Sequence, residues 1–210
     1  MRTKDKRKSL KLVGFLLIIL GLSTLSFKMI SYIFKNIEEK ENITNFKDNQ
    51  EQKVEDDKET ITEDKADTTP KAKEQYIALL EIPKINLEKG LYDIKSKNNN
   101  VDKNIQILKE SNMPDVENGN LILAGHSGNG QKAYFKDLVK LTKDDIATIV
   151  YKNRKYSYKL VDNYEIEKTG KTTFNCSLST KTLTLITCKE DTNKQLIYIF
   201  EEIEESDYNG

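Results

Sequence analysis

The 210-residue chain has no tryptophan, one histidine, two cysteines, three prolines and three arginines. A single histidine excludes a zinc site built on several histidines, and two cysteines are too few for a disulfide scaffold. Thirty-four basic residues balance thirty-four acidic ones, with a pI near 6.6, whereas nucleic-acid-binding domains usually present a basic face. What remains is a globular or membrane-anchored protein whose chemistry, if it has any, uses few special residues.

The N-terminal part is basic and then apolar. Residues 1–35 hold eight basic residues and one acid, and residues 12–27 are sixteen consecutive uncharged residues. As a helix this run covers about 24 Å, short of the roughly 30 Å hydrocarbon core, but it reaches about 35 Å through residue 34 if Lys28 snorkels. We predict a cytoplasmic basic tail over 1–11 and a single-pass transmembrane anchor over 12–34, with the remaining chain extracellular. A cleaved secretory signal is the alternative, but no small-residue cleavage pattern follows the run.

The next part of the chain is polar and acidic. Residues 36–74 contain thirteen acids and seven lysines, and one aromatic residue, Phe46. Such a composition buries too little apolar surface to offset the entropy lost on ordering. We therefore predict a disordered, charged extracellular linker over 35–74, although 37–47 has the spacing of a charged amphipathic helix.

From residue 75 onward, short apolar runs alternate with turn residues. The pattern predicts helices over 103–110, capped by Asp102, and over 134–141. It predicts strands over 76–82, 121–124, 146–152, 155–166, 182–187 and 196–203, with a hairpin turn at 153–154. Several strands at short spacing with brief helices indicate a mainly β domain over 75–210, folded as a closed or nearly closed β-barrel.

Two reactive side chains stand where predicted strands end. His126 follows the apolar run 121–124, and Cys188 follows the alternating run 182–187. Each residue alone is more often structural, because a cysteine at a strand end is usually a small buried apolar residue. Together, in an extracellular domain, they fit a thiol nucleophile with an imidazole partner.

The motifs around these residues resemble the sortases, the membrane-anchored transpeptidases of Gram-positive bacteria. They are IPKI at 82–85, LAGH at 123–126 and TLTLITC at 182–188, in that order. The resemblance covers about 76–203 and implies an eight-stranded β-barrel. It also implies cleavage of a C-terminal sorting signal on surface proteins and transfer of the freed carboxyl to a peptidoglycan amine. No cofactor or metal is expected for thiol acyl transfer, and no ligand spacing argues for calcium.

The resemblance implies a role for each reactive residue. The Cys188 thiolate would attack a backbone carbonyl of the sorting motif and form a thioacyl enzyme. His126 would protonate the leaving amine and later deprotonate the incoming one.

The chain departs from the family at the oxyanion-stabilising arginine. Sortases place an arginine at the start of the last strand, but no arginine follows Cys188 in this chain. Gln195 falls at the matching place, and its amide can donate a hydrogen bond to an oxyanion without the help of a charge. Lys194, Arg154 and a backbone donor are the alternatives.

Several further features of the sequence bear on regulation and class. Cys176, in a loop before the Cys188 strand, is either an incidental thiol or a partner for a regulatory disulfide. The region 163–178 lies where sortases recognise the sorting motif. The chain ends without an apolar segment, which favours a wall-anchoring type over the pilin-polymerising type. A peptidase that releases the thioacyl group to water and a catalytically silent barrel that binds sorting signals are the competing functions.

Overall fold

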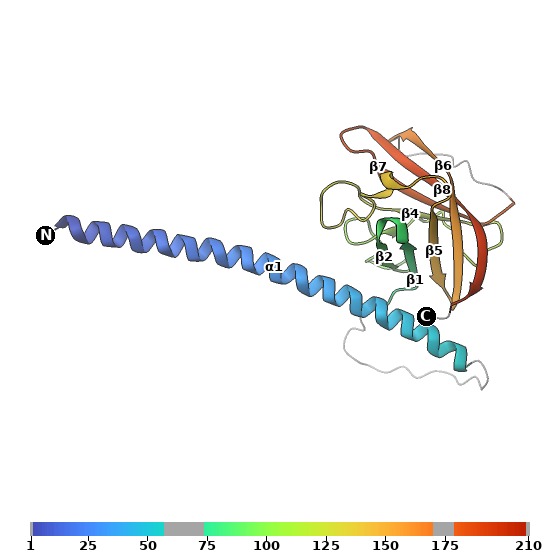
Figure 1. The fold of residues 1–210 in the computed structure, drawn as a ribbon, viewed down its shortest axis with the longest axis horizontal. Helices are drawn as coiled ribbons and strands as arrows, with labels where there is room; N and C mark the ends of the chain where they lie inside the picture. Colours follow the sequence, from blue (N-terminus) through green and yellow to red (C-terminus); the bar gives the residue numbers. More distant parts are fainter. Residues whose placement is uncertain (1, 57–73, 170–178, 209–210) are drawn as a thin grey trace. The chain divides into compact units, whose positions relative to one another are not determined.

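The computed structural model describes residues 2–56, 74–169 and 179–208 (Figure 1). In these three described segments, one α-helix precedes eight strands, and two short 3-10 helices lie among the strands. The elements are α1 (Arg2–Asp56), β1 (Ala78–Ile82), η1 (Pro83–Ile85), β2 (Leu87–Leu91), β3 (Gln106–Ile107), β4 (Asn120–Ala124), η2 (Leu138–Lys140), β5 (Ile146–Tyr151), β6 (Arg154–Glu167), β7 (Thr182–Cys188) and β8 (Lys194–Asp207).

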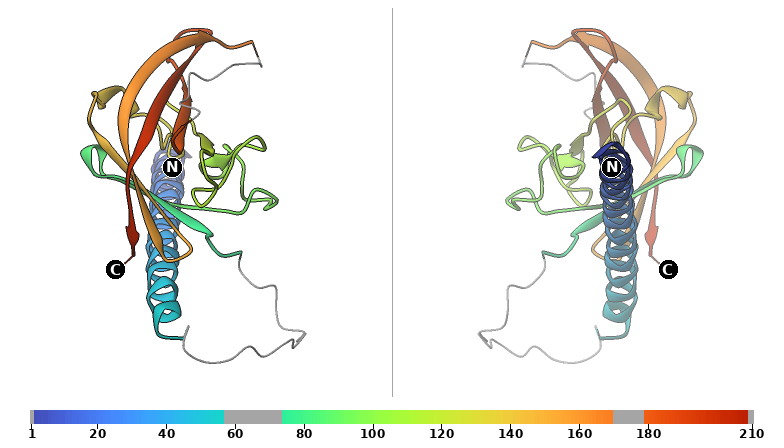
Figure 2. Two further views of the ribbon diagram at one scale, coloured as in Figure 1. Left: turned by 90° about the vertical axis from the view of Figure 1, so that its right-hand side faces the viewer. Right: turned by 90° about the vertical axis from the view of Figure 1, so that its left-hand side faces the viewer.

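The strands form one sheet in the order β2-β1-β5-β6-β8-β7-β4-β3. All pairs are antiparallel except β4 and β7, which run parallel. The sheet curls into a nearly closed barrel, as the two side views in Figure 2 show. Across the seam, the Asn104 side chain just before β3 donates a hydrogen bond of 2.7 Å to the Gly90 carbonyl of β2. The mainly β, eight-stranded barrel with short helices is thereby confirmed, in its nearly closed form.

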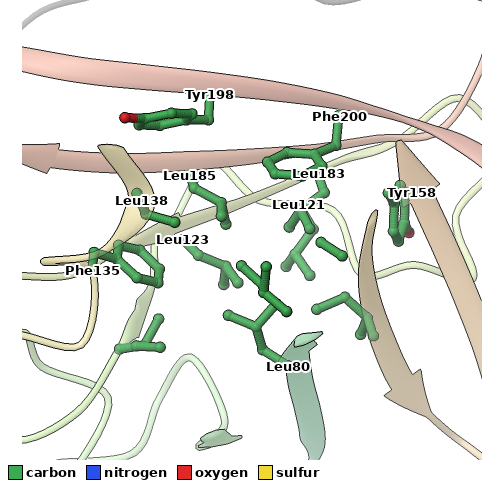
Figure 3. Packing of buried hydrophobic residues seen from close by; sticks show 14 of the residues in the cluster. Leu80, Leu121, Leu123, Phe135, Leu138, Tyr158, Leu183, Leu185, Tyr198 and Phe200 are labelled. Atoms are coloured by element: carbon green, nitrogen blue, oxygen red, sulfur yellow. The ribbon is translucent and has the colours of Figure 1, made fainter. Parts of the chain in front are cut away.

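The central strands are buried on both faces. One face of β4 and β7 places alternate leucines in the main core, together with Phe135, Tyr198 and Phe200 (Figure 3). The intervening residues form a second apolar cluster of isoleucines: Ile122, Ile186, Ile197 and Ile199. Because side chains in a strand alternate with a period of two, Cys188 lies on the same face as Ile186.

The β5–β6 hairpin turns one residue earlier than predicted. Lys152 and Asn153 both have positive φ angles, 49° and 58°. This is the arrangement of a two-residue type I′ turn, whose twist matches that of the flanking strands. The chain therefore enters β6 at Arg154, and β6 then pairs with β8 along the whole length of both strands.

Both predicted helices are wrong: the first is absent, and the second is reduced to one short 3-10 helix. In place of a helix over 103–110, residues Gln106–Ile107 form β3. The Asn99 side chain holds this segment extended, because its oxygen accepts from the Ile107 amide at 2.7 Å and its nitrogen donates to the Ile107 carbonyl at 2.9 Å. Within 134–141 only the 3-10 helix η2 is present. The strand β2, which reads LEKGL, has no clear alternation and was not predicted.

The predicted disorder of the linker is wrong for residues 35–56, which continue α1. Ile43 and Phe46, three residues apart on the helix, are buried in a cluster with Leu79, Val150 and Tyr208. The Gln50 side-chain oxygen accepts a hydrogen bond of 2.6 Å from the Asn153 amide. Burying a phenylalanine contributes about 2–3 kcal/mol, which offsets part of the ordering entropy. Residues 57–73 lie outside the described part of the chain.

The N-terminal half of α1 carries the apolar run that suggested a membrane anchor. Among the described residues, no helix is both long enough and apolar enough to cross a membrane. The transmembrane anchor predicted over 12–34 is therefore not confirmed.

Candidate active site

The parallel pair β4–β7 brings the histidine and cysteine segments together. Ala124 and Ile186 are the last paired positions of these strands, and His126 and Cys188 each follow two residues later. Hydrogen bonds tie the two strand ends beyond this point. The Gly125 amide donates to the Ile186 carbonyl at 3.1 Å, and the Ser127 hydroxyl donates to the Cys188 carbonyl at 2.7 Å. The two candidate catalytic residues thus leave neighbouring strands side by side.

The backbone around His126 is fixed by close packing. A Cβ atom at Gly125 would approach the Phe135 ring to 2.7 Å, so glycine is required for this close approach. The Phe135 amide donates to the His126 carbonyl at 3.0 Å, and the Thr187 hydroxyl donates to the Gly125 carbonyl at 2.9 Å. In the LAGH motif, the glycine therefore sets the path of the backbone, and the histidine supplies the imidazole.

The imidazole of His126 has a carboxylate neighbour. Its Nε2 atom lies 3.2 Å from Asp102 Oδ1, and the two side chains are 44% and 81% exposed. The Asp102 carboxylate, which was predicted to cap a helix, instead faces the histidine. An exposed pair of this kind orients the ring but contributes little energy.

Cys188 is a free, half-buried thiol at the end of β7. Its cross-strand partner on β8 is Gln195. Because directly paired residues project to the same face, Gln195 and Cys188 share one face of the sheet, and the role of Gln195 as oxyanion donor stays a prediction. The remaining alternative from the sequence is a backbone amide that donates to the oxyanion. The hydrogen bonds at this end of β7 do not identify one.

The other cations weighed from the sequence are engaged elsewhere. Lys194 lies 3.3 Å from Glu165, which also pairs with Lys189. Hydrogen bonds from Lys189 and then Lys194 lower the pKa of Glu165 below its ordinary value. Arg154 begins β6, twelve residues along β8 from Gln195 by register, or roughly 40 Å. Its guanidinium binds Glu205 and Asp207, so Arg154 does not reach the thiol.

One residue near the thiol was not found by sequence reasoning. Lys168 follows the last residue of β6, and its Nζ atom lies 4.0 Å from Cys188 Sγ. A single lysine in a chain with many lysines gave no signal of its own. Only the pairing of β6, β8 and β7 brings it to the sulfur.

A cavity of about 760 Å³ opens beside Cys188. Its wall includes the loop after His126 at Ser127–Asn129, the segment around η2, and residues of β6 and β8. The wall combines apolar side chains such as Leu196 and Tyr198 with charged ones such as Lys189 and Glu190. A cavity of this size, with both apolar and polar walls, is suited to bind part of a peptide or a small molecule.

The described residues contain no group of three or more histidine, cysteine, aspartate or glutamate side chains placed to hold a metal ion. Cys176 falls in the segment 170–178, outside the described residues, so its predicted role is not tested.

Comparison with protein-family models gives one match to this domain. Residues 80–201, more than half of the chain, match the model described as "Sortase domain". The matched range begins within β1, contains β2 to β7 and ends within β8, and therefore includes both His126 and Cys188. No curated protein matches the chain.

Solved structures of similar fold come from several sortase types. A lid mutant of sortase A from Corynebacterium diphtheriae superposes with a TM-score of 0.56 at 19% identity, covering 64% of this chain and 73% of that one. Sortase D5 from Clostridium perfringens, described as a transpeptidase, gives 0.53 at 25% identity, covering 62% and 80%. Sortase C from Streptococcus pneumoniae gives 0.55 at 22% identity, covering 61% and 69%. The likeness spans types A, C and D without selecting one.

Proposed function

The chain belongs to the sortase family, and we propose that it is a cysteine transpeptidase that joins surface proteins to a cell-wall peptidoglycan amine. The observation that carries this proposal is the placement of His126 and Cys188 at neighbouring ends of the parallel strands β4 and β7. The hydrogen bond from Ser127 to the Cys188 carbonyl supports it, because it keeps the two ends together. The substrates we propose are sorting-signal-bearing proteins at the cell surface.

The first half of the reaction forms a thioacyl enzyme. The Cys188 thiolate adds to the carbonyl carbon of the scissile peptide, and the negative charge moves to the carbonyl oxygen. The Gln195 amide, directly opposite Cys188, donates a hydrogen bond to that oxyanion. As the carbon–nitrogen bond breaks, His126 gives a proton to the leaving amine.

The second half returns the enzyme to its starting state. An amine enters as acceptor, His126 removes its proton, and the nitrogen attacks the thioacyl carbon. The carbon–sulfur bond breaks, a new amide forms, and the thiolate of Cys188 is released. No group beyond these side chains is needed to balance the reaction.

Intact-protein mass spectrometry tests this proposal. The full-length protein is incubated with a pool of sorting-signal peptides and no amine, and the Cys188→Ala variant serves as the matched control. We expect a mass gain equal to the N-terminal fragment of one peptide in the wild type and none in the variant. Adding an amine should then discharge the adduct into a peptide–amine product.

Three other outcomes would overturn the proposal in different ways. Hydrolysis of the peptide at a rate that added amine does not change would indicate a peptidase. A bound but uncleaved peptide, with Cys188 still open to alkylation, would indicate a silent binding barrel. An adduct that persists in Cys188→Ala would remove this thiol from the chemistry.

A further inference from the structure

The backbone at the end of β6 is held in register beyond the strand itself. The Lys168 amide donates a hydrogen bond of 3.0 Å to the Asn193 carbonyl, in the turn that leads into β8. On the other side of the same turn, the Lys189 amide donates a hydrogen bond of 3.0 Å to the Lys194 carbonyl. Lys168 is therefore fixed to the β7–β8 turn, one residue past the last pair of the β6–β8 ladder.

The side chain of Lys168 lies on the face of the sheet that carries the thiol. Gln195 of β8 pairs with Cys188 on one side and with Ile166 on the other, so these three residues form a row across three strands. Lys168, two residues after Ile166, projects to the same face because strand side chains alternate. Two strand spacings are about 10 Å, a gap that a lysine and a cysteine side chain can close diagonally.

The ammonium group completes this placement. Lys168 Nζ is 4.0 Å from Cys188 Sγ, within hydrogen-bond reach of a sulfur atom. The two other lysines at this end of the ladder, Lys189 and Lys194, both pair with Glu165. Lys194 alternates with Gln195 along β8, so its side chain leaves the sheet on the opposite face, and Lys189 follows β7 in the cavity wall, where Glu165 binds its ammonium group. Lys168 is thus the cation that the described residues direct at the nucleophile.

We propose that Lys168 is a catalytic residue that stabilises the thiolate of Cys188. When the S–H bond breaks, the proton passes to a base, the role that the proposed function gives to His126, and the negative charge on sulfur faces the ammonium group. Lys168 keeps its own protons throughout. In this arrangement two side chains do the work for which sortases use an arginine, since Lys168 supplies the charge and Gln195 supplies the oxyanion donor. The catalytic meaning rests on the proposed function, but the effect on the thiol does not.

The test measures the reactivity of the thiol without any peptide substrate. Full-length wild type, Lys168→Gln, Lys168→Arg and Lys159→Gln are alkylated with iodoacetamide from pH 6 to pH 10. Trypsin cuts after Lys181 and Lys189, so Cys188 is read on the fragment 182–189, free of Cys176. Lys159→Gln is the matched control, because it removes the same charge from the same strand, far from the thiol, where the lysine lies 3.4 Å from Asp144.

We expect Lys168→Gln to be alkylated about fivefold more slowly than wild type at pH 7, the effect of one charge about 4 Å away in a mostly aqueous setting. The difference should vanish near pH 10, where the thiolate forms without help. Lys168→Arg should restore most of the rate, and Lys159→Gln should match wild type.

Equal rates for Lys168→Gln and wild type at pH 7 would overturn the proposal. A loss that persists unchanged at pH 10 would also overturn it, because it would reflect altered access and not charge. Since alkylation needs no sorting signal, this result is independent of whether a thioacyl adduct forms. An absent adduct together with the expected alkylation pattern would reject the proposed function and keep the role of Lys168 at the thiol.

Discussion

At one end of the β6–β8 ladder, cations and carboxylates neutralise one another, while at the other end a lysine faces a thiol. At the paired end, Arg154 binds Glu205 and Asp207, and Lys181 lies 2.7 Å from Glu205. At the reactive end, Lys168 approaches Cys188 across Gln195. The same two strands therefore carry a purely ionic cluster at one end and the candidate nucleophile at the other.

The difference shows what each kind of contact contributes. Exposed ion pairs such as those of Arg154 add little to stability and are screened by salt, but they hold the free ends of two long strands in register. A cation beside a thiol stabilises the charged, reactive form of that thiol. We expect substitutions at the reactive end to change rates with little effect on folding, and substitutions at the paired end to do the reverse.

The largest effect is expected for His126→Ala. Removing a general acid and base should lower the rate of peptide–amine formation by about 100- to 10,000-fold. The thermal unfolding midpoint should change little, because the imidazole is 44% exposed. A transpeptidation assay with the peptide and amine found by mass spectrometry measures the rate. A loss below tenfold would show that another group transfers the proton.

A smaller effect is expected for Gln195→Ala. Losing one neutral hydrogen bond to the oxyanion, worth about 0.5–1.5 kcal/mol, should slow thioacyl formation by about 3- to 10-fold. The iodoacetamide rate of Cys188 should stay close to wild type, since alkylation forms no oxyanion. Lys168→Gln, by contrast, should slow both reactions. If Gln195→Ala slows alkylation as much as acylation, the division of labour between the two residues is wrong.

A still smaller effect is expected for Asp102→Asn. The Asp102 carboxylate is 81% exposed at 3.2 Å from His126, and exposed pairs contribute about 0.2–1 kcal/mol. The rate of peptide–amine formation should fall by no more than about fivefold. The transpeptidation assay, run on both proteins under identical conditions, measures this rate. A loss above tenfold would show that Asp102 does more than orient the imidazole.

No change in rate is expected for Glu205→Gln at the paired end. A hydrogen bond from Lys181, and to a lesser degree one from Arg154, lowers the pKa of Glu205 below 4.5. A lowered pKa contributes stability above the unfolded-state pKa, and that stability is lost as the pH falls through the folded-state value. The variant should therefore unfold about 0.5–1 kcal/mol more easily at pH 7. The difference in unfolding free energy between the variant and wild type should disappear as the pH falls below 4.5.

Urea unfolding of both proteins at several pH values measures this gap. The alkylation rate of Cys188 is also compared between Glu205→Gln and wild type, and we expect the two rates to be equal. A slower alkylation rate in this variant would mean that the two ends of the ladder are coupled, and the comparison between them would fail.

Much of the barrel was predictable because its strands carry local signals. Alternation and turn residues located β1, β4, β5, β6, β7 and β8 to within a few residues, except that β8 extends well beyond its predicted ends. The strands β2 and β3 were missed because neither alternates clearly. The predicted helix over 103–110 failed because contacts with Asn99, outside the segment, hold Ile107 in an extended conformation.

The sequence by itself indicated the family and, through that resemblance, the eight-stranded barrel, and it located His126 and Cys188 at strand ends, because short motifs are local features of the chain. It also pointed to Gln195 in place of the missing arginine. Only the tertiary structure placed Lys168 at the thiol and moved Arg154 away from it. The reason is physical: which side chains meet across a sheet depends on strand order and register, and these are set by contacts between residues far apart in the chain.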